Sequence, residues 1–514
     1  MRRRTGLRLA GAGLAGLLLA GCVGWAREDS LVRVDGGQLR GVVAADHRSF
    51  QGIPYAAPPE GGLRWRDPEP VRPWTGVREA TKPGSPCPQE GTPYAPTRST
   101  DEDCLFLNVT TPRHGKGKPV MVWLHGDGVV GSGALFDGVP LATAGDVVVV
   151  TVNYRLGVFG GFGLPGLAGS GTFGLADQQA ALRWVRDNIA AFGGDPGNVT
   201  LFGTSYGASA TTAHLVSPSA RGLFHRASVH SGQAMMPLPA GAVLPGVPAV
   251  DWFTWRALAE TEQLGTAMAA ELGCAEQALD CMRKLPVDKL FPLMRLFQSH
   301  AFGGPLLPEV PAAALRAGKA HPVPVVLGMT RDEHRTFTGL FRGEVKPEEY
   351  PVLLREAFGD KAERIERAYP VAEHGSPALA WSAVLTDGLW AKATAEQAGL
   401  GAGKTWAYVF NDREAPSYLP FPPGFPPGAF HASDTPYLFP DKEFRANARP
   451  DQRALAERMT RQWTAFARTG SPNGPGLPHW PEYGAGKVLG LDPAGSALVD
   501  FAAQHRLGFW RGLG

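Results

Sequence analysis

The chain has 514 residues, of which 44% are hydrophobic and 19% charged, so it can bury a large core and is not a disordered chain. Its formal net charge is +2, and four of its basic residues (Arg2, Arg3, Arg4 and Arg8) stand at the N-terminus. No basic tract that could neutralise phosphates occurs elsewhere, which excludes nucleic acid as a favoured partner.

The first 21 residues have the layout of a secretory signal. A basic start is followed by a small, apolar run that is too short to span a bilayer comfortably. The run ends in Leu19-Ala20-Gly21-Cys22, which resembles the bacterial lipobox, where the cysteine is lipidated and becomes the first residue. We predict a signal peptide over residues 1–21, export, and a lipid anchor at Cys22 on the outer face of the cell membrane, with plain secretion as the alternative.

The apolar pattern alternates between short and long segments. Short β-branched runs bounded by Gly or Pro predict buried strands, and longer amphipathic segments predict helices. The alternation predicts an α/β fold with a mostly parallel sheet covered by helices on both faces. The predicted strands lie at residues 120–125, 147–152, 199–203, 227–232, 324–329 and 406–410, and the predicted helices at residues 176–192, 378–400 and 451–468.

Two segments depart from this alternation. Residues 233–320 are helical and loop-rich, and we predict that they form an insertion above the sheet rather than an independent domain. Residues 415–428 are rich in proline and lead directly to His431, so we predict a stiff, ordered loop.

Four cysteines remain besides Cys22. Their even number in an exported protein predicts disulfides, with buried free thiols as the alternative. Three connectivities are possible, and pairing of sequence neighbours closes two short loops. No C-x-x-C pair or nearby histidine suggests a metal site. The four residues are Cys87, Cys104, Cys274 and Cys281.

Gly203-Thr204-Ser205-Tyr206-Gly207 is a G-x-S-x-G pentapeptide between a predicted strand and a segment of small residues. Alone it is a weak signal, because any glycine-rich turn can match it. In this context it predicts a sharp strand-to-helix turn that exposes the hydroxyl of Ser205 as a nucleophile.

A serine nucleophile needs a base, and the base needs an acid to orient it. In α/β-hydrolases the acid and then the histidine follow the serine along the chain. Asp332 and Glu333 come directly after the predicted strand 324–329, and His431 follows further on. These residues are the candidates for the acid and the base.

His125-Gly126-Asp127-Gly128 follows the predicted strand 120–125. With Gly131 the segment also matches the dinucleotide fingerprint G-x-G-x-x-G, but neither a helical pattern nor an acidic residue after the next strand accompanies it. The preferred interpretation is an oxyanion loop, whose glycines let backbone N–H groups reach a substrate oxygen.

Together these motifs resemble the type-B carboxylesterases, the cholinesterase-like branch of the α/β-hydrolase superfamily. The resemblance extends over residues 31–510, and its segments occur in the family's order. They include FQGIPYAAPPEGGLRW (50–65), EDCLFLNV (102–109), NYRLGVFG (153–160), DQQAALRWVRDNIAAFGGDPGNVTLFG (177–203), HSGQ (230–233), HASDTPYLF (431–439) and FARTGSPN (466–473).

The resemblance implies a role for each matching residue. Ser205 corresponds to the acylated nucleophile, His431 to the general base and acid, and Glu333 to the acid, with Asp332 as its rival. Asp127, Gly128 and Tyr206 correspond to the oxyanion donors, and Ser231 to a serine beside the acid. The cysteines correspond to two family disulfides, Cys87–Cys104 and Cys274–Cys281.

The chain departs from the family at four positions near these residues. Thr204 replaces the glutamate of the family's GESAG. Asp127 replaces a glycine of the family's HGGG, and an ionised carboxylate pointing into the oxyanion site would oppose the developing charge. Tyr206 replaces alanine and adds bulk near the oxyanion site. His334 replaces the usual glycine after the acid. The segment between Cys87 and Cys104 carries no tryptophan, which argues against choline recognition.

We therefore predict a serine carboxylesterase acting on small-molecule esters, with a single α/β-hydrolase domain over residues 22–514. The resemblance implies neither a metal nor an organic cofactor. The alternatives are a non-catalytic binding protein with the same fold, and a lipase.

Overall fold

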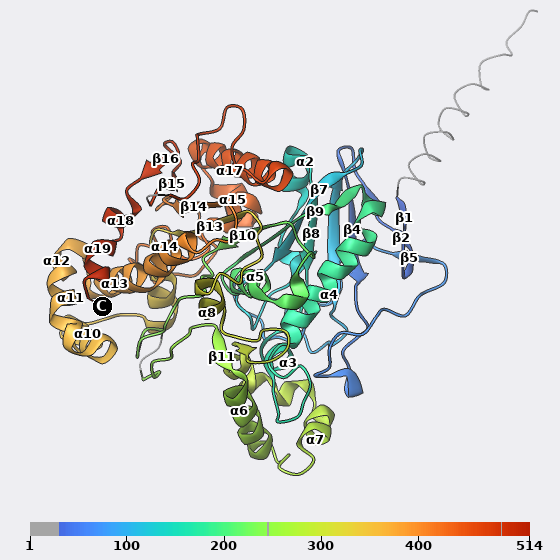
Figure 1. Ribbon diagram of the computed structural model, residues 1–514, viewed down its shortest axis with the longest axis horizontal. Helices are drawn as coiled ribbons and strands as arrows, with labels where there is room; N and C mark the ends of the chain where they lie inside the picture. The colour runs from blue at the N-terminus through green and yellow to red at the C-terminus, as the bar shows by residue number, and fades with distance from the viewer. Residues whose placement is uncertain (1–29, 244–245, 485, 514) are drawn as a thin grey trace, which may run out of the picture.

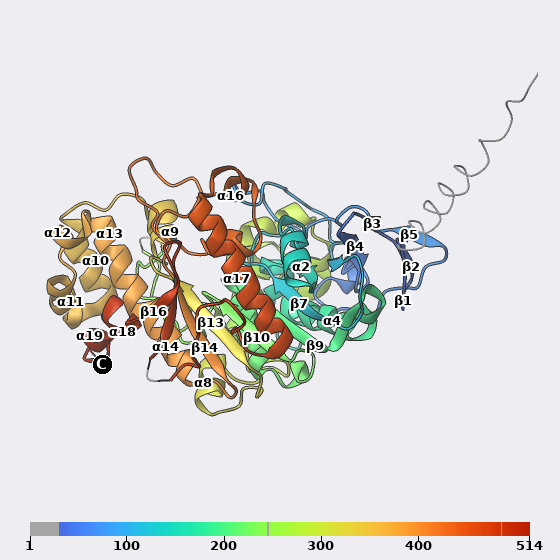
Figure 2. The same ribbon diagram turned by 90° about the horizontal axis from the view of Figure 1, so that it is seen from above.

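The computed structural model describes residues 30–243, 246–484 and 486–513, and the predicted signal peptide and Cys22 lie outside these ranges. An eleven-stranded sheet forms the centre of the molecule (Figures 1 and 2). From edge to edge its strands are β16 (Ala497–Val499), β15 (Val488–Leu491), β14 (Thr405–Phe410), β13 (Val325–Thr330), β10 (Arg226–His230), β9 (Gly194–Thr204), β7 (Lys118–Leu124), β8 (Val148–Val152), β6 (Phe106–Pro112), β4 (His47–Pro54) and β3 (Val42–Val43).

The middle of the sheet is parallel and its edges are antiparallel. All strands from β15 to β8 run in one direction, whereas β16, β6, β4 and β3 pair antiparallel with their neighbours. Every residue of β8, β13 and β14 is buried. This explains why these strands appear in the sequence as continuous apolar runs. All six predicted strands lie in the parallel part, and the predicted fold class is confirmed.

Helices cover both faces of the sheet. Because side chains alternate along a strand, Met121 and Trp123 of β7 join one hydrophobic cluster, and Val120 and Val122 join the other. The first cluster includes residues of α17, which crosses the sheet in Figure 2. The second includes residues of α4 and α5. These helices span Pro450–Thr469 (α17), Phe173–Asn188 (α4) and Tyr206–Val216 (α5).

All three predicted helical segments are helical in the structure, but their ends differ from the prediction and one of them is interrupted. Helix α4 continues as a 3-10 turn and stops at Gly193, whose φ of 93° is left-handed. Residues 378–400 do not form one regular helix. They divide into α13 (Pro377–Leu385), a π-helical segment (Thr386–Ala391) and α14 (Lys392–Gly399).

Two long segments follow the carboxyl ends of parallel strands. The predicted insertion 233–320 comes after β10, and a second helical segment, which the sequence analysis did not single out, comes after β13. The first contains β11 (Trp255–Ala257), α6 (Leu258–Glu271), α7 (Ala278–Lys284), β12 (His300–Phe302) and α8 (Pro311–Arg316). The second contains α9 (Arg335–Phe337), α10 (Glu349–Phe358), α11 (Ala362–Ala368) and α12 (Val371–His374).

The remaining elements are a small sheet and several short helices (Figure 1). Strands β1 (Leu31–Val34), β2 (Gly37–Arg40) and β5 (Val77–Glu79) form a small separate sheet. The other helices are α2 (Val139–Gly145), α3 (Gly157–Gly161), α15 (Thr435–Leu438), α16 (Lys442–Asn447), α18 (Phe501–Gln504) and α19 (Leu507–Arg511).

Two disulfides, Cys87–Cys104 and Cys274–Cys281, are present. This is the pairing implied by the family resemblance, and it is confirmed. Disulfides persist in oxidising compartments, so both bonds are typical of a protein that leaves the cytosol. No helix in the described ranges is long and apolar enough to cross a membrane.

Candidate active site

Ser205 stands at the turn between β9 and α5. Its φ of 55° and ψ of −121° are unusual for a residue with a side chain. The turn is tight, because a Cβ built on Gly207 would lie 2.1 Å from the carbonyl oxygen of Leu124. The N–H of Ser205 donates to the carbonyl of His230 at 2.8 Å. These contacts hold the hydroxyl at the carboxyl edge of the sheet, as predicted for a strand-to-helix turn.

His431 joins Ser205 to Glu333 through two hydrogen bonds. Its Nε2 lies 2.8 Å from Ser205 Oγ, and its Nδ1 lies 2.5 Å from Glu333 Oε2. Each residue follows a different parallel strand, namely β9, β13 or β14, whose carboxyl ends share one edge. Glu333 is fully buried and His431 is 7% exposed, so water is largely excluded from both bonds. The arrangement can move a proton from the hydroxyl to the imidazole.

The second oxygen of Glu333 is also occupied. Its Oε1 accepts hydrogen bonds from Ser231 Oγ at 2.5 Å and from the N–H of Thr330 at 2.8 Å. A buried carboxylate requires such donors to replace its hydration. Ser231 therefore lies beside Glu333, where the resemblance places it.

Asp332 points elsewhere, although it is adjacent to Glu333 in the sequence. Arg413 donates to its two carboxylate oxygens from Nε at 2.8 Å and from Nη2 at 2.7 Å, and the N–H of Ala429 donates at 3.0 Å. Burial raises the pKa of Asp332, but the hydrogen bond from Arg413 and the charges of Arg335 and Arg413 outweigh it and lower the pKa. The structure thus places Glu333, and not Asp332, on His431.

Aromatic side chains support the ring of His431. The ring centroid of Trp390 lies 4.9 Å from that of His431, and Phe337 lies at 5.2 Å. Trp390 comes from the π-helical segment Thr386–Ala391, and such segments often occur at functional sites. Sequence reasoning missed both residues, because no motif links them to a histidine so distant in the chain. Residues 415–428 form no helix or strand, as predicted.

Gly126, Asp127 and Gly128 follow β7 and lie against Ser205. A Cβ built on Gly126 would lie 3.1 Å from Ser205 Cβ. The N–H groups of Asp127 and Gly128 have no hydrogen-bond partner in the described part of the chain, and Tyr206 is the first residue of α5, where helical N–H groups lack intrahelical partners. Free N–H groups beside a hydroxyl can bind a developing oxyanion. A 3-10 turn, Gly133–Leu135, follows this loop instead of the helix that a dinucleotide fingerprint requires.

The carboxylate of Asp127 is bound to its neighbours. Its Oδ2 accepts a hydrogen bond from the Tyr94 hydroxyl, and its Oδ1 accepts one from the N–H of Val129 at 3.2 Å. The carbonyl oxygen of Asp127 accepts from Gln298 Nε2 at 2.5 Å. Tyr94 and Gln298 belong to no motif, so the sequence offered no signal for these contacts.

Tyr206 adds bulk next to the oxyanion loop, as expected. A Cβ built on Gly128 would lie 2.6 Å from its ring. The ring stacks on His300 of β12 at 4.3 Å between centroids, and its hydroxyl lies 3.2 Å from His300 Nδ1. Burial lowers the pKa of His300 to about 3, so this histidine is neutral at physiological pH.

A small, mainly apolar cavity lies next to His431. Phe337 and Trp390 line this cavity and also support the ring of His431. Its other lining residues are Met236, Pro237, Leu238, Val243, Phe253, His334 and Leu389. A larger cavity of about 600 Å³ lies at the opposite edge of the sheet, beside Arg226, Pro324 and Lys404.

His334 is buried beside the small cavity that Phe337 and Trp390 line. Its Nε2 lies 3.0 Å from the carbonyl of Ala242, and its Nδ1 accepts from Trp390 Nε1 at 3.4 Å. Burial lowers the pKa of His334 to about 4. The neutral ring therefore supports Trp390, which in turn packs on His431.

This environment predicts acid instability. Histidine protonates near pH 6.5 in the unfolded chain but near pH 4 at His334 in the folded one. Between these values the unfolded state binds more protons, so the stabilisation is complete above pH 6.5 and decreases as the pH falls to 4. We expect the melting temperature to fall over this interval, and to fall less steeply in His334→Gln. His479→Gln, which changes an exposed histidine, should follow the wild type. Identical curves for all three proteins in thermal scans would contradict the prediction.

Comparisons with known proteins agree with this geometry. The sequence profile of the carboxylesterase family matches residues 28–510. The chain is 34% identical to para-nitrobenzyl esterase of Bacillus subtilis (strain 168), over 88% of this chain and 92% of that protein. It is 32% identical to cocaine esterase of Homo sapiens, over 94% of this chain and 89% of that protein. A solved structure of PNB esterase superposes with a TM-score of 0.78 at 30% identity, covering 94% of this chain and 99% of that one.

A mostly parallel sheet that carries a serine, a histidine and a glutamate at its carboxyl edge defines an α/β-hydrolase. The chain belongs to the carboxylesterase family. Its activity is the hydrolysis of carboxylic esters.

Proposed function

We propose that the chain is a serine carboxylesterase in which Ser205 is acylated by the substrate. His431 is the general base and acid, and Glu333 orients it. The observation that carries this proposal is the continuous hydrogen-bond chain from Ser205 Oγ through His431 to Glu333. The oxyanion donors are the N–H groups of Asp127, Gly128 and Tyr206.

The reaction runs in two halves. His431 Nε2 accepts the Ser205 proton while Oγ attacks the ester carbonyl carbon, and the oxyanion donors bind the oxygen that becomes negative. The tetrahedral intermediate collapses, the alcohol leaves with the proton from His431, and the acyl group stays on Oγ. Water then attacks this acyl-enzyme, giving its proton to His431, and the carboxylic acid leaves as Oγ regains a proton. The carboxylate of Glu333 stabilises the imidazolium of His431. The cycle needs neither a metal nor an organic cofactor.

The substrates are small-molecule esters with at least one apolar part. The apolar rings of Phe337 and Trp390, which pack against His431, support this substrate class. So do the names of the relatives, cocaine esterase and para-nitrobenzyl esterase, which describe esterases of small molecules.

The proposal extends to the organisation of the chain. Residues 1–21 are a lipoprotein-type signal peptide, and residues 22–514 are a single α/β-hydrolase domain. A lipid on Cys22 anchors the enzyme on the outer face of the bacterial cell membrane. The lipobox-like tetrapeptide and the two disulfides support export.

Covalent labelling tests the proposal. A fluorophosphonate should add once to the folded protein, on the peptide that contains Ser205, and should abolish hydrolysis of p-nitrophenyl butyrate. Rapid mixing with p-nitrophenyl acetate should release a burst of about one p-nitrophenol per active site when deacylation limits the rate. Turnover that survives complete labelling, or an adduct on another residue, would overturn the assignment. Rates on acetate, butyrate and octanoate esters, with and without emulsified triglyceride, distinguish an esterase from a lipase.

A further inference from the structure

Asp127 occupies a backbone conformation that favours glycine. Its φ is 75°, and Gly128 follows with a φ of 84°. A residue with a Cβ in the left-handed region costs on the order of 1 kcal/mol or more. The proposed oxyanion loop therefore contains a strained residue whose carboxylate, if released, could swing towards the charge that develops in the reaction.

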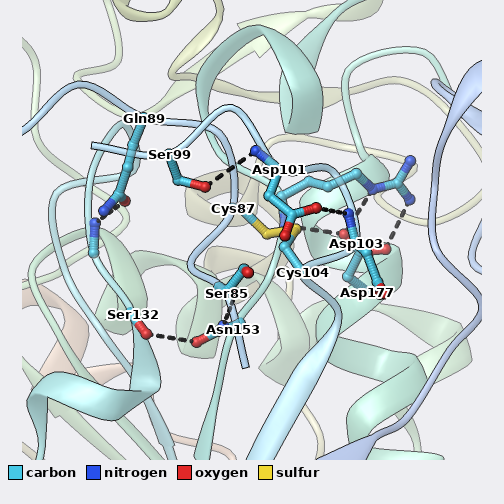
Figure 3. The surroundings of a disulfide bond; sticks show 12 residues. Ser85, Cys87, Gln89, Ser99, Asp101, Asp103, Cys104, Ser132, Asn153 and Asp177 are labelled. Atoms are coloured by element: carbon cyan, nitrogen blue, oxygen red, sulfur yellow. Dashed lines mark hydrogen bonds and ion pairs between the residues drawn. A yellow bond between two sulfur atoms is a disulfide. The ribbon is translucent and has the colours of Figure 1, made fainter. Parts of the chain in front are cut away.

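The loop closed by the Cys87–Cys104 disulfide lies next to the oxyanion loop and is itself ordered. Gln89 and Ser99 exchange two backbone hydrogen bonds of 3.0 Å. A turn stabilised by hydrogen bonds between Thr92 and Ala95 carries Tyr94. Figure 3 shows Gln89 and Ser99 on this loop beside the disulfide.

Polar contacts hold the far end of the oxyanion loop. Gln89 Oε1 accepts from the N–H of Gly131 at 2.7 Å. Asn153 bridges Ser132 Oγ, at 3.0 Å, to the carbonyl of Ser85, at 3.0 Å (Figure 3). At the reacting end, the only side-chain hydroxyl in the described residues that donates to Asp127 is that of Tyr94.

We propose that Tyr94 is a positioning residue for the oxyanion loop, which acts by binding the Asp127 carboxylate and holding it away from the oxyanion site. This inference rests on the proposed function of the loop. The Tyr94 hydroxyl binds Oδ2, Val129 N–H binds Oδ1, and Gln298 holds the carbonyl of Asp127 from the insertion. With all three hydrogen bonds in place, the Asp127 peptide is fixed and its carboxylate is bound by two donors. Tyr94 lies outside the segments that resemble the family, and its proposed role arises from the presence of Asp127 in this chain.

Tyr94→Phe tests the proposal, because it removes only the donor. We expect kcat for p-nitrophenyl butyrate to fall about 10- to 100-fold with KM changed less than about 2-fold, since an oxyanion donor acts mainly in the transition state. The inhibition constant of a trifluoromethyl ketone, which forms a tetrahedral oxyanion on the nucleophile, should rise by a similar factor. Tyr483→Phe is the matched control. It removes a hydroxyl that donates to Ala395, at the opposite edge of the sheet, and should leave both constants unchanged.

A double-mutant cycle separates this role from a general structural one. In an Asp127→Gly background no carboxylate remains and a positive φ is unstrained, so Tyr94→Phe should then change kcat less than about 2-fold. In an Asp127→Asn background, where the charge alone is removed, most of the effect of Tyr94→Phe should also disappear. An unchanged kcat in Tyr94→Phe, or an equal loss in all three backgrounds, would overturn the proposal. If Tyr94→Phe alone does not fold, the two double variants still test the proposal. The kcat of each double variant must then match the kcat of the corresponding single Asp127 variant.

Failure of the proposed function would look different. In that case labelling of Ser205 and loss of turnover would not coincide, whatever the state of Tyr94. If labelling succeeds and the cycle shows no coupling between Tyr94 and Asp127, only the positioning role is wrong.

Discussion

Ser205→Ala is expected to lower kcat for p-nitrophenyl butyrate by about 10⁴- to 10⁶-fold, the range found when one residue of a catalytic triad is removed. The variant keeps the oxyanion loop and the side chains around residue 205, so substrate can still bind, but no acyl-enzyme can form. The initial burst of p-nitrophenol should vanish completely. Purified wild type and variant are compared by steady-state and rapid-mixing kinetics.

Ser209→Ala provides the matched control for this change. Ser209 is a buried serine one turn after Ser205, and its N–H donates to the carbonyl of Ser205. The substitution keeps that backbone bond, so kcat should stay within about 3-fold of the wild type, well below the loss at a nucleophile. Retention of more than about 1% of wild-type turnover in Ser205→Ala would exclude Ser205 as the nucleophile.

The fold was predictable because its main elements leave local traces. The parallel strands are buried on both faces, and they therefore appear as uninterrupted apolar runs such as residues 147–152. Helix α4 continues as a 3-10 turn that ends at Gly193, and this left-handed glycine marks the end of the helical segment both in the sequence and in the structure. The apolar pattern of residues 378–400 does not predict the π-helical interruption at Thr386–Ala391, all of whose residues are buried.

The position of each candidate site residue was predictable for a related reason. Residues that directly follow parallel strands meet at one edge, which brings Ser205 and Glu333 within reach of His431. The supporting contacts were not predictable. Trp390 on His431 and Tyr94 on Asp127 depend on how distant segments pack, and the sequence contains no spacing that joins them.

The sequence pattern also does not decide which of two adjacent carboxylates is the acid that orients His431. Asp332 and Glu333 follow the same strand, and only the family resemblance favoured Glu333. The structure separates them by their partners. Arg413 binds both oxygens of Asp332, whereas Glu333 is hydrogen-bonded to Ser231 and His431. The decisive residue, Arg413, lies after β14 and has no sequence relation to either acid.

Glu333→Gln is expected to lower kcat by about 10³- to 10⁴-fold with little change in KM. The amide keeps the shape of the side chain but removes the charge that stabilises the imidazolium of His431. It can also donate to His431 Nδ1, which leaves the proton on Nε2, where the imidazole cannot accept the proton of Ser205. The wrong tautomer and the lost charge both act on the chemical step, so binding of substrate is spared.

Asp332→Asn separates the two acids, since it makes the same chemical change one residue away. Its partners are Arg413, Arg335 and the N–H of Ala429, none of which contacts Ser205. The variant should lose stability, because Arg335 and the half-exposed Arg413 lose the counter-charge of the buried Asp332. Since solvent screens Arg413, the variant should lose less stability than the breaking of a fully buried pair would cost. Its kcat should fall less than about 10-fold, as for a change outside the reacting groups. Kinetics and thermal scans of both variants decide the matter, because a larger kcat loss in Asp332→Asn than in Glu333→Gln would assign the acid to Asp332.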